Sequence, residues 1–371
     1  MVNSTETFMN SMDSKQARFR QTLNRIVRPA AVVLVTLALA PAAVFAQSKQ
    51  LLLFSWANYV PPELLKRFEA ETGIKVSLDV YDSNDTMLAK LQAGGGGYDI
   101  VVPSNSVLAT MIRSGLLLKV DASKLANFKN VAAPHDHPDA DRNRDYSVPY
   151  LWGSTGFTYD SAKVPGGKLD DSWKEFFEPR PALAGKIAAL NDQGEMFSAA
   201  ALYLGLNTCT ENPADAQRIL ELLEKQKPNV KIYSSTGTIG RVAAGEVVLH
   251  QQWNGASHRS KEKLATAVFV FPAEGMNLWG DNFAVPKGSP NPENAKVFMN
   301  WMMDPKNAGE ASNFGGYNNA IKGSDAFMNA ELRNDPAINP PEVLRSRFRP
   351  VKDCSPKARE LRDGVWTRLR R

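Results

Sequence analysis

Short runs of apolar residues alternate along this chain with segments whose apolar residues recur every three or four positions. Residues 51–54 form the first run, and a short apolar run bounded by turn residues is typical of a buried strand. Residues 61–71 follow, with Leu64, Leu65 and Phe68 on one face and two prolines at the start, a pattern that predicts a helix. The alternation of strand and helix patterns favours an α/β fold.

The same alternation continues to the C-terminal end of the chain. We expect further strands at 75–80, 98–104, 186–190, 247–250 and 267–271 and one beginning at Asp281, and further helices at 86–92, 196–204, 215–225, 292–303 and 355–369.

The N-terminal segment, residues 1–46, has the pattern of a secretory signal. Several arginines precede an apolar run at 30–40, and small residues end the segment at Ala46. A positive start, a short apolar stretch and a small residue at the cleavage point are typical of an export signal. The run is shorter than the ~20 apolar residues of a membrane-spanning helix. We therefore expect cleavage near Gln47 and an exported chain without a membrane span.

Removal of residues 1–46 changes the charge of the protein. That segment holds five basic and two acidic side chains, so the formal net charge falls from +5 for the full chain to +2 for the rest. A nearly balanced charge without a basic stripe argues against a nucleic-acid partner. The remaining ~325 residues exceed what one hydrophobic core usually holds, so we expect two lobes.

Cys209 and Cys354 are the only cysteines of the sequence. An exported chain meets an oxidising compartment, where a disulfide can form. Pairing cannot be deduced from the sequence, so a disulfide and two free thiols both remain open.

Aromatic and acidic residues gather at the carboxyl ends of the predicted strands. In an open α/β sheet, ligands bind at this edge. Aromatic faces attract cations, and carboxylates pair with ammonium groups. We therefore expect a cleft for a cationic ligand. The residues that follow predicted strands are Trp56, Tyr59, Ser104, Ser106, Asp192, Glu195 and Trp253, and Trp279 and Asp281 precede the segment NFAVP.

Each of these residues also has a purely structural interpretation. Trp56 and Tyr59 could be packing residues, and Asp281 could be a turn residue. Asp192 and Glu195 lie three positions apart at a helix start, where acidic side chains cap the helix. Their coincidence at strand ends favours the binding site.

Two other classes of function have weaker support. Residues 135–141, His-Asp-His-Pro-Asp-Ala-Asp, lack the spacing of a tetrahedral metal site, so a solvated loop is favoured over a metal receptor. No Gly-x-Ser-x-Gly motif occurs, which disfavours a secreted enzyme. We expect neither a cofactor nor a metal.

Several stretches together resemble the periplasmic spermidine/putrescine (polyamine)-binding proteins of ABC importers, within the bacterial extracellular solute-binding proteins of family 1. The stretches are SWANYVPPELLKRFEAETGIKV, GYDIVVPS, VPYLWGSTG, WGDNFAVPKG, INPPEVL and the tryptophan of HQQWNG. The resemblance covers essentially the whole mature chain. It implies a two-lobed periplasmic-binding-protein type II fold, each lobe a mixed sheet flanked by helices, with a cleft between the lobes.

The resemblance also implies a function without catalysis. Such a receptor captures a small aliphatic amine in its cleft and delivers it to the permease of an ABC importer. We expect a periplasmic monomer whose first lobe comprises 49–156 plus 282–322 and whose second lobe comprises 157–281 plus 323–371.

Ligand contacts follow from the resemblance residue by residue. Trp56 and Tyr59 match the aromatic pair of the first loop, and Ser104 matches a polar contact. Asp192 and Glu195 match the acidic pair that holds amines. The remaining aromatic walls and the carboxylate near the hinge are matched by Trp253, Trp279, Asp281 and Tyr317, and weaker candidates are Asn58 and Ser106.

Two positions depart from the family pattern. Asn58 stands where an acid usually precedes the tyrosine, and Ala256 stands where putrescine-type members carry an acid after the cleft tryptophan. Fewer carboxylates compensate a multiply charged ligand less well. Putrescine or spermidine remains the expected ligand, and an ω-amino acid such as γ-aminobutyrate (GABA) is the alternative. His258 or Arg241 would then meet its carboxylate.

Overall fold

The computed structural model describes residues 48–94 and 96–371. The predicted export signal, residues 1–46, lies outside the described residues. The strands are β1 (Gln50–Trp56), β2 (Lys75–Tyr81), β3 (Ile100–Val101), β4 (Ser147–Asp160), β5 (Ile187–Ala189), β6 (Val230–Tyr233), β7 (Leu249–Trp253), β8 (Ala267–Val270), β9 (Met276–Ala284), β10 (Asn318–Asn319) and β11 (Phe348–Pro350). The α-helices are α1 (Pro62–Thr72), α2 (Asn84–Gln92), α3 (Asn105–Arg113), α4 (Lys174–Phe177), α5 (Gln193–Tyr203), α6 (Pro213–Gln226), α7 (Thr238–Arg241), α8 (Asn254–Lys263), α9 (Pro292–Met302), α10 (Pro305–Gly315), α11 (Ala330–Asn334) and α12 (Pro356–Leu369).

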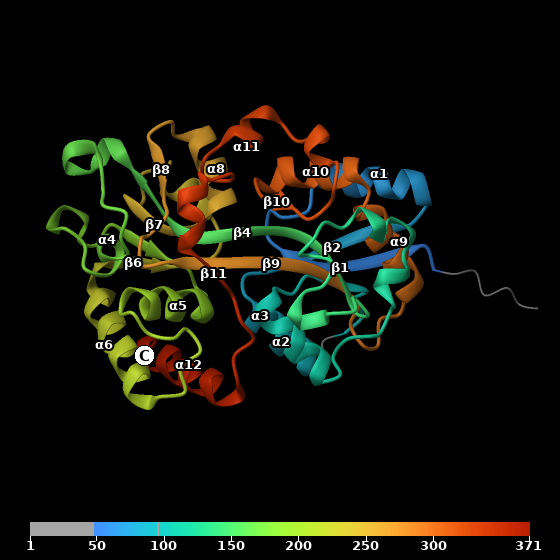
Figure 1. Ribbon diagram of the computed structural model, residues 1–371, viewed down its shortest axis with the longest axis horizontal. Helices are drawn as coiled ribbons and strands as arrows, with labels where there is room; N and C mark the ends of the chain where they lie inside the picture. Colours follow the sequence, from blue (N-terminus) through green and yellow to red (C-terminus); the bar gives the residue numbers. More distant parts are fainter. Residues whose placement is uncertain (1–47, 95) are drawn as a thin grey trace, which may run out of the picture. The chain divides into compact units, whose positions relative to one another are not determined.

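Within the described residues, eleven strands form one mixed sheet (Figure 1). Its main path runs in the order β2-β1-β3-β9-β4-β7-β5-β6, and β8, β10 and β11 pair at the sides of β4 and β9. β1 is parallel to β2 and β3, and β5 is parallel to β6 and β7. The antiparallel strands β4 and β9 pair with each other between these two sets, so they join the two halves of the sheet.

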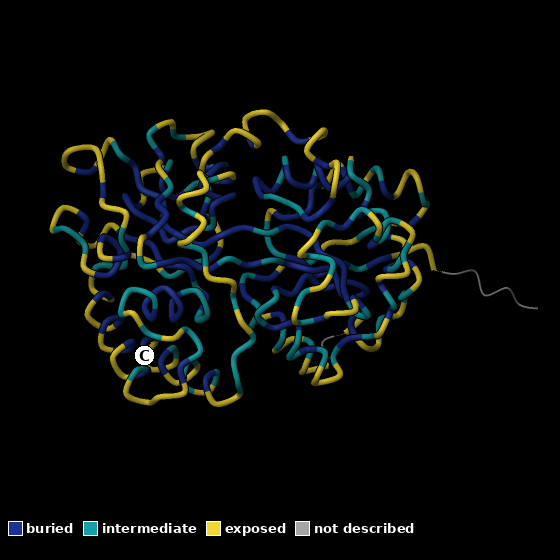
Figure 2. The backbone as a smooth tube through the Cα atoms, in the orientation of Figure 1, coloured by how far each residue is buried: buried dark blue, intermediate teal, exposed yellow. Residues whose placement is uncertain are grey.

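Each half of the sheet has its own hydrophobic core. The first core includes Leu53 of β1, Phe68 of α1 and Phe298 of α9. The second core includes Ile187 of β5 and Leu223 of α6. Figure 2 shows the strands as largely buried and the exposed residues in the surrounding helices and loops. The structure therefore has the two-lobed α/β architecture expected from the sequence.

Several helices begin at signals that are visible in the sequence. A proline lies in the first turn of five helices: α1, α6, α9, α10 and α12. Backbone amides of the first turn have no acceptor within the helix, so a proline, which lacks the amide hydrogen, breaks no hydrogen bond there. The side chains of Ser83 and Ser355 cap α2 and α12 by accepting hydrogen bonds from backbone amides. α1 ends at Gly73, whose φ of 72° suits glycine.

The structure differs from the predicted elements in several places: β4, β6, α3 and α8 were not expected, and the strand expected from Asp281 begins earlier, at Met276 of β9. The strand expected at 98–104 is reduced to the two residues of β3. The strand expected at 247–250 lies later, as β7, so Trp253 ends a strand instead of following one. Helix α10 was not predicted, because its buried positions are mostly small residues that give a weak apolar period.

Candidate functional site

A cavity of about 110 Å³ is lined by side chains from β1 and the loop after it, α5, α8, β9 and α12. All the residues predicted as ligand contacts line this one cavity: Trp56, Asn58, Tyr59, Ser104, Ser106, Asp192, Glu195, Trp253, Trp279, Asp281 and Tyr317. The fold thus brings together residues that are far apart in the sequence. Their role as ligand contacts stays a prediction.

Asp281 of β9 is a buried carboxylate, 5% exposed. Its Oδ2 accepts a hydrogen bond from the Tyr59 hydroxyl (2.7 Å), and its Oδ1 accepts one from the Ser104 hydroxyl (2.5 Å). Burial raises the pKa of Asp281 to about 7, although both hydrogen bonds act to lower it. Among residues 48–94 and 96–371, no basic side chain pairs with this carboxylate. Asp281 is therefore a buried acid that lacks a cation.

Glu195 lies in the first turn of α5 and is a second, partly buried acid of the cavity. Its carboxylate accepts hydrogen bonds from the Thr155 hydroxyl (2.8 Å) and the Asn277 amide (2.7 Å). A third bond comes from the Trp253 indole. Burial raises the pKa of Glu195, and the neighbouring charge of Asp192 raises it further. All three hydrogen-bond donors are neutral, so they do not neutralise the charge.

Asp192 both caps a helix and lines the cavity. It is the N-cap residue of α5, and its Oδ1 accepts a hydrogen bond from the Glu195 amide (3.0 Å). Burial raises the pKa of Asp192, and Asp85 of α2 raises it further. Arg362 of α12 and two backbone amides act in the opposite direction. Asp192 therefore caps α5, as one interpretation of the sequence expected, and also lines the cavity.

The aromatic side chains of the cavity pack against one another edge to face. Ring centroids are 6.3 Å apart for Trp56 and Trp253, 5.8 Å for Tyr59 and Tyr317, and 5.1 Å for Trp279 and Tyr317. Tyr59, Trp279 and Tyr317 are buried members of the first core, whereas Trp56 and Trp253 are only partly buried. The aromatic residues thus contribute to packing and form the cavity wall at the same time.

Two glycines make room for these rings. A Cβ atom on Gly153 would lie 2.8 Å from the Trp279 ring, and one on Gly255 would lie 2.4 Å from the Tyr317 ring. Atoms this close would overlap, so the rings pack directly on backbone that carries no side chain.

β9 sets the spacing of the polar groups in the wall. Alternate residues of a strand face the same side, and Asn277, Trp279 and Asp281 all line the cavity. Asn277 holds Glu195 at one end of this row, Asp281 is the other end, and Trp279 lies between them. At about 3.3 Å per residue, the Cα atoms of the two ends are roughly 13 Å apart.

The segment that leads into α12 forms another part of the wall. Val351, Lys352 and Cys354 line the cavity together with Cys209. Cys209 and Cys354 form a disulfide, which answers the question that the sequence left open. The disulfide fixes this segment to the loop between α5 and α6.

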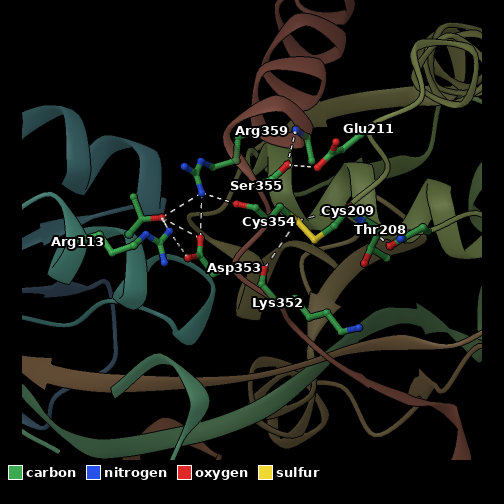
Figure 3. The surroundings of a disulfide bond; sticks show 12 residues. Arg113, Thr208, Cys209, Glu211, Lys352, Asp353, Cys354, Ser355 and Arg359 are labelled. Atoms are coloured by element: carbon green, nitrogen blue, oxygen red, sulfur yellow. Dashed lines mark hydrogen bonds and ion pairs between the residues drawn. A yellow bond between two sulfur atoms is a disulfide. The ribbon is translucent and has the colours of Figure 1, made fainter. Parts of the chain in front are cut away.

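An ion-pair cluster next to the disulfide connects the segment to α3 (Figure 3). Asp353 pairs with Arg113 of α3 (2.6 Å) and with Arg359 of α12 (3.0 Å). The Thr110 hydroxyl of α3 also donates a hydrogen bond to Asp353 (2.8 Å). Asp353 therefore links a helix of the first half to the last helix of the chain.

Sequence reasoning missed several residues of the site. Thr155 and Asn277 hold Glu195, and the basic residues at the cavity are Arg259, Lys352 and Arg362. The two-residue spacing along β9 could have revealed the asparagine. The basic residues carried no such signal, because their approach to the cavity depends on how the helices pack.

The basic residues suggested for a ligand carboxylate lie elsewhere. His258 Nδ1 bonds the Asp335 carboxylate (2.6 Å). Arg241 contacts the ring of His250 (3.0 Å) and pairs with Glu246 (3.3 Å). Neither His258 nor Arg241 lines the cavity, so the carboxylate of an ω-amino acid would meet a different basic residue.

Residues 135–141 are partly buried, whereas a solvated loop was expected from the sequence. Asp141 is buried and accepts hydrogen bonds from the backbone amides of Asp145, Tyr146 and Ser147. In the part of the chain that the structure describes, no group of three or more His, Cys, Asp and Glu side chains is arranged to hold a metal ion. None of the described helices is long and apolar enough to span a membrane.

Comparison with known proteins identifies the class. Residues 63–340 match the family of bacterial extracellular solute-binding proteins. Because the match spans well over half of the chain, the chain belongs to this family. It is a solute-binding protein and not an enzyme.

Individual relatives agree with the resemblance found in the sequence. The putrescine-binding periplasmic protein SpuD of Pseudomonas aeruginosa is 33% identical over 340 residues, which cover 88% of this chain and 93% of SpuD. The spermidine/putrescine-binding periplasmic protein 1 of Haemophilus influenzae is 35% identical over 290 residues, which cover 78% of this chain and 80% of that relative. The solved structure of the spermidine/putrescine ABC transporter substrate-binding protein PotD of Streptococcus pneumoniae superposes with a TM-score of 0.70 at 26% identity, covering 86% of this chain and 98% of that chain.

Proposed function

We propose that this protein is a periplasmic receptor that captures a small aliphatic amine, of the putrescine or spermidine type, and delivers it to the permease of an ABC importer. The observation that carries the proposal is the pair formed by the buried acid Asp281 and the partly buried acid Glu195, which within the described residues have only neutral hydrogen-bond donors in an aromatic-walled cavity. Burying an unpaired carboxylate is costly, and an ammonium group supplies the missing opposite charge.

The spacing along β9 suits a short diamine. The nitrogens of an extended four-carbon diamine are roughly 6 Å apart, since five bonds of about 1.5 Å separate them in a zigzag. A hydrogen bond of about 2.8 Å at each end gives roughly 12 Å between the two acceptors. The Asp281 carboxylate and the Glu195 carboxylate, which Asn277 holds, lie at opposite ends of a five-residue stretch of β9 and can be separated by a span of this order. The alkyl chain would then lie against Trp279.

The relatives support both the ligand class and the compartment. Their names give putrescine or spermidine as the ligand and the periplasm as the location. A disulfide such as Cys209–Cys354 persists in an oxidising compartment, and the periplasm is one. The predicted export signal points to the same compartment.

The mechanism we propose is capture and presentation without covalent chemistry. The predicted lobes, 49–156 plus 282–322 and 157–281 plus 323–371, would close over the ligand. A ligand shifts such an equilibrium only by contacting the closed form more favourably than the open form. By analogy with the family, the closed monomer would dock on its permease.

A thermal-shift panel on the mature chain tests this function. The ligands are putrescine, cadaverine, spermidine, spermine and γ-aminobutyrate, with n-butylamine as a matched control that has one ammonium group. Because a ligand that binds only the folded state raises the melting temperature, we expect a rise with the diamines and little rise with butylamine. No rise with any polyamine would contradict the proposal.

A receptor for an ω-amino acid is the second candidate. It is favoured by the basic side chains Arg259, Lys352 and Arg362 at the cavity, any of which could meet a carboxylate. In the same panel, a rise with γ-aminobutyrate alone would support this candidate over the polyamine receptor.

A further inference from the structure

Arg362 of α12 is a basic side chain whose place in the cavity the proposed function does not explain. It lines the cavity, and its buried Nε finds no hydrogen-bond partner within residues 48–94 and 96–371. No carboxylate of the described residues lies within ion-pair distance of it. A guanidinium is always charged at neutral pH, so this cation acts on whatever occupies the cavity.

The nearest acidic groups to consider are Asp192 and Asp85. The position that a Cβ atom would take on Gly194 is 3.2 Å from Asp192 Oδ1 and 3.6 Å from Arg362 Nη1. The Asp192 carboxylate and the Arg362 guanidinium therefore both lie beside Gly194, no more than about 7 Å apart. Burial raises the pKa of Asp85 of α2 and Arg362 acts to lower it, and the charge of Asp85 acts to raise the pKa of Asp192.

In the part of the chain that the structure describes, the other two acids of the cavity have no such cation. Asp281 is held by the hydroxyls of Tyr59 and Ser104, and Glu195 is held by uncharged donors. Among the described residues, the cavity thus contains two acids with no cation nearby and a third acid, Asp192, that has the Arg362 guanidinium near it but beyond ion-pair distance. Two ammonium groups of a ligand would compensate the charges of Asp281 and Glu195, whereas a third ammonium group would lie near the positive charge of Arg362.

We propose that Arg362 is a specificity-determining residue: its guanidinium takes the place of a third ammonium group beside Asp192, so the cavity selects diamines over the triamine spermidine. This inference rests on the proposed function and adds the number of ammonium groups that the site accepts. Like charges a few ångströms apart in a partly buried site repel strongly enough to change affinity by roughly tenfold or more.

The test is calorimetric titration of putrescine and spermidine into the mature wild-type chain, Arg362→Gln and Arg368→Gln. Arg368 is an exposed arginine of the same helix and is the matched control. We expect the wild type to bind putrescine at least tenfold more tightly than spermidine. Arg362→Gln should reduce this preference at least tenfold, mainly by tightening spermidine binding, and Arg368→Gln should leave it unchanged.

Further variants separate a charge effect from a folding effect. Arg362→Lys keeps the positive charge and should retain the preference for putrescine, and thermal melts of all variants report whether they fold. An unchanged preference in folded Arg362→Gln would overturn the inference while leaving the amine receptor intact. Loss of γ-aminobutyrate binding in Arg362→Gln would also overturn it, because the residue would then be an anion site. A wild type that binds no amine would overturn the proposed function itself.

Discussion

Asp281 shows at the scale of one residue why this site fits a cation. The carboxylate is buried on β9 and accepts hydrogen bonds from the hydroxyls of Tyr59 and Ser104. Hydroxyl donors orient a carboxylate but leave its charge in place. Because burial makes that charge costly, the ligand-free site gains from any cation that enters.

Asp281→Asn should therefore weaken putrescine binding by roughly ten- to a hundredfold, the size of one hydrogen bond to a charged group. Calorimetric titration of the mature chain measures the effect. The control is Asn58→Gly, which lies at the same cavity and keeps the left-handed backbone (φ 57°) that an alanine would strain. Equal losses in the two variants would contradict the charge assignment.

The same residue predicts how binding depends on pH. Burial raises the pKa of Asp281 to about 7, so the carboxyl is largely protonated at pH 6 and largely ionised at pH 8. The amine groups of the ligand stay charged throughout, since their pKa lies near that of lysine. Putrescine should therefore bind roughly tenfold more weakly at pH 6 than at pH 8, with proton release near pH 7.

The stability of the ligand-free protein depends on pH in the opposite direction to its affinity for putrescine. Its folded state holds a proton on Asp281 over a pH range, from the usual aspartate value of 3.8 up to about 7, in which the unfolded chain has lost it. This carboxyl therefore lowers the stability of the ligand-free protein as pH rises through that range.

For binding, putrescine affinities that are equal at pH 6 and pH 8 would show that the Asp281 carboxylate does not meet the ligand.

At the scale of single elements, the sequence predicted helices and strands where the periodicity of apolar residues is strong. The first strand and α1 were predictable from apolar runs and prolines, but α10 was not, because its buried residues are small. Trp279 and Asp281 could be placed at a strand, although the sequence did not show that they lie within β9 and not before it. Arg362 could not be found, since α12 reaches the cavity only through tertiary packing.

β9 also supports a prediction for Trp279, which lies between the two acidic ends of the row. Trp279→Ala should weaken putrescine binding at least tenfold, because the alkyl chain loses the indole surface. The fold should survive, as judged by circular dichroism, although the melting temperature should fall with the loss of a buried side chain. Unchanged affinity in the folded variant would remove the residue from the site.

The disulfide between Cys209 and Cys354 joins residues 145 positions apart. Crosslinks of long loops typically stabilise a protein by about 2–4 kcal/mol. Replacing both cysteines with serine should lower the free energy of unfolding in urea by about this amount and weaken putrescine binding, since both residues line the cavity. An unfolding free energy equal to that of the wild type would show that the ion-pair cluster of Asp353 suffices to hold the segment.

At the scale of the whole molecule, the sequence predicted the class of protein better than it predicted the contacts around the cavity. Aromatic and acidic residues near predicted strand ends indicated one site, and the fold brings all of them to one cavity, from the end of β1, the start of α5, the end of β7 and the middle of β9. Thr155, which holds Glu195, was not predictable, since a polar residue within a strand gives no sign of its partner, whereas the spacing along β9 could have indicated Asn277 as a residue of the cavity. The disulfide likewise depends on a separation that no local pattern encodes.

Export is a prediction at the same scale. Residues 1–46 have the pattern of a cleaved signal, so the protein recovered from the periplasm should begin near Gln47. Intact-mass measurement of that fraction checks the cleavage point. A mass that still includes residues 1–46 would contradict it.

The most direct test of the account is a crystal structure of the mature protein with putrescine. We predict one ammonium nitrogen within hydrogen-bond distance of the Asp281 carboxylate, the other within hydrogen-bond distance of the Glu195 carboxylate, and the alkyl chain against Trp279. A putrescine molecule bound away from both carboxylates, or a cavity that stays empty at saturating ligand, would contradict the central claim that these two acids read the ends of a diamine.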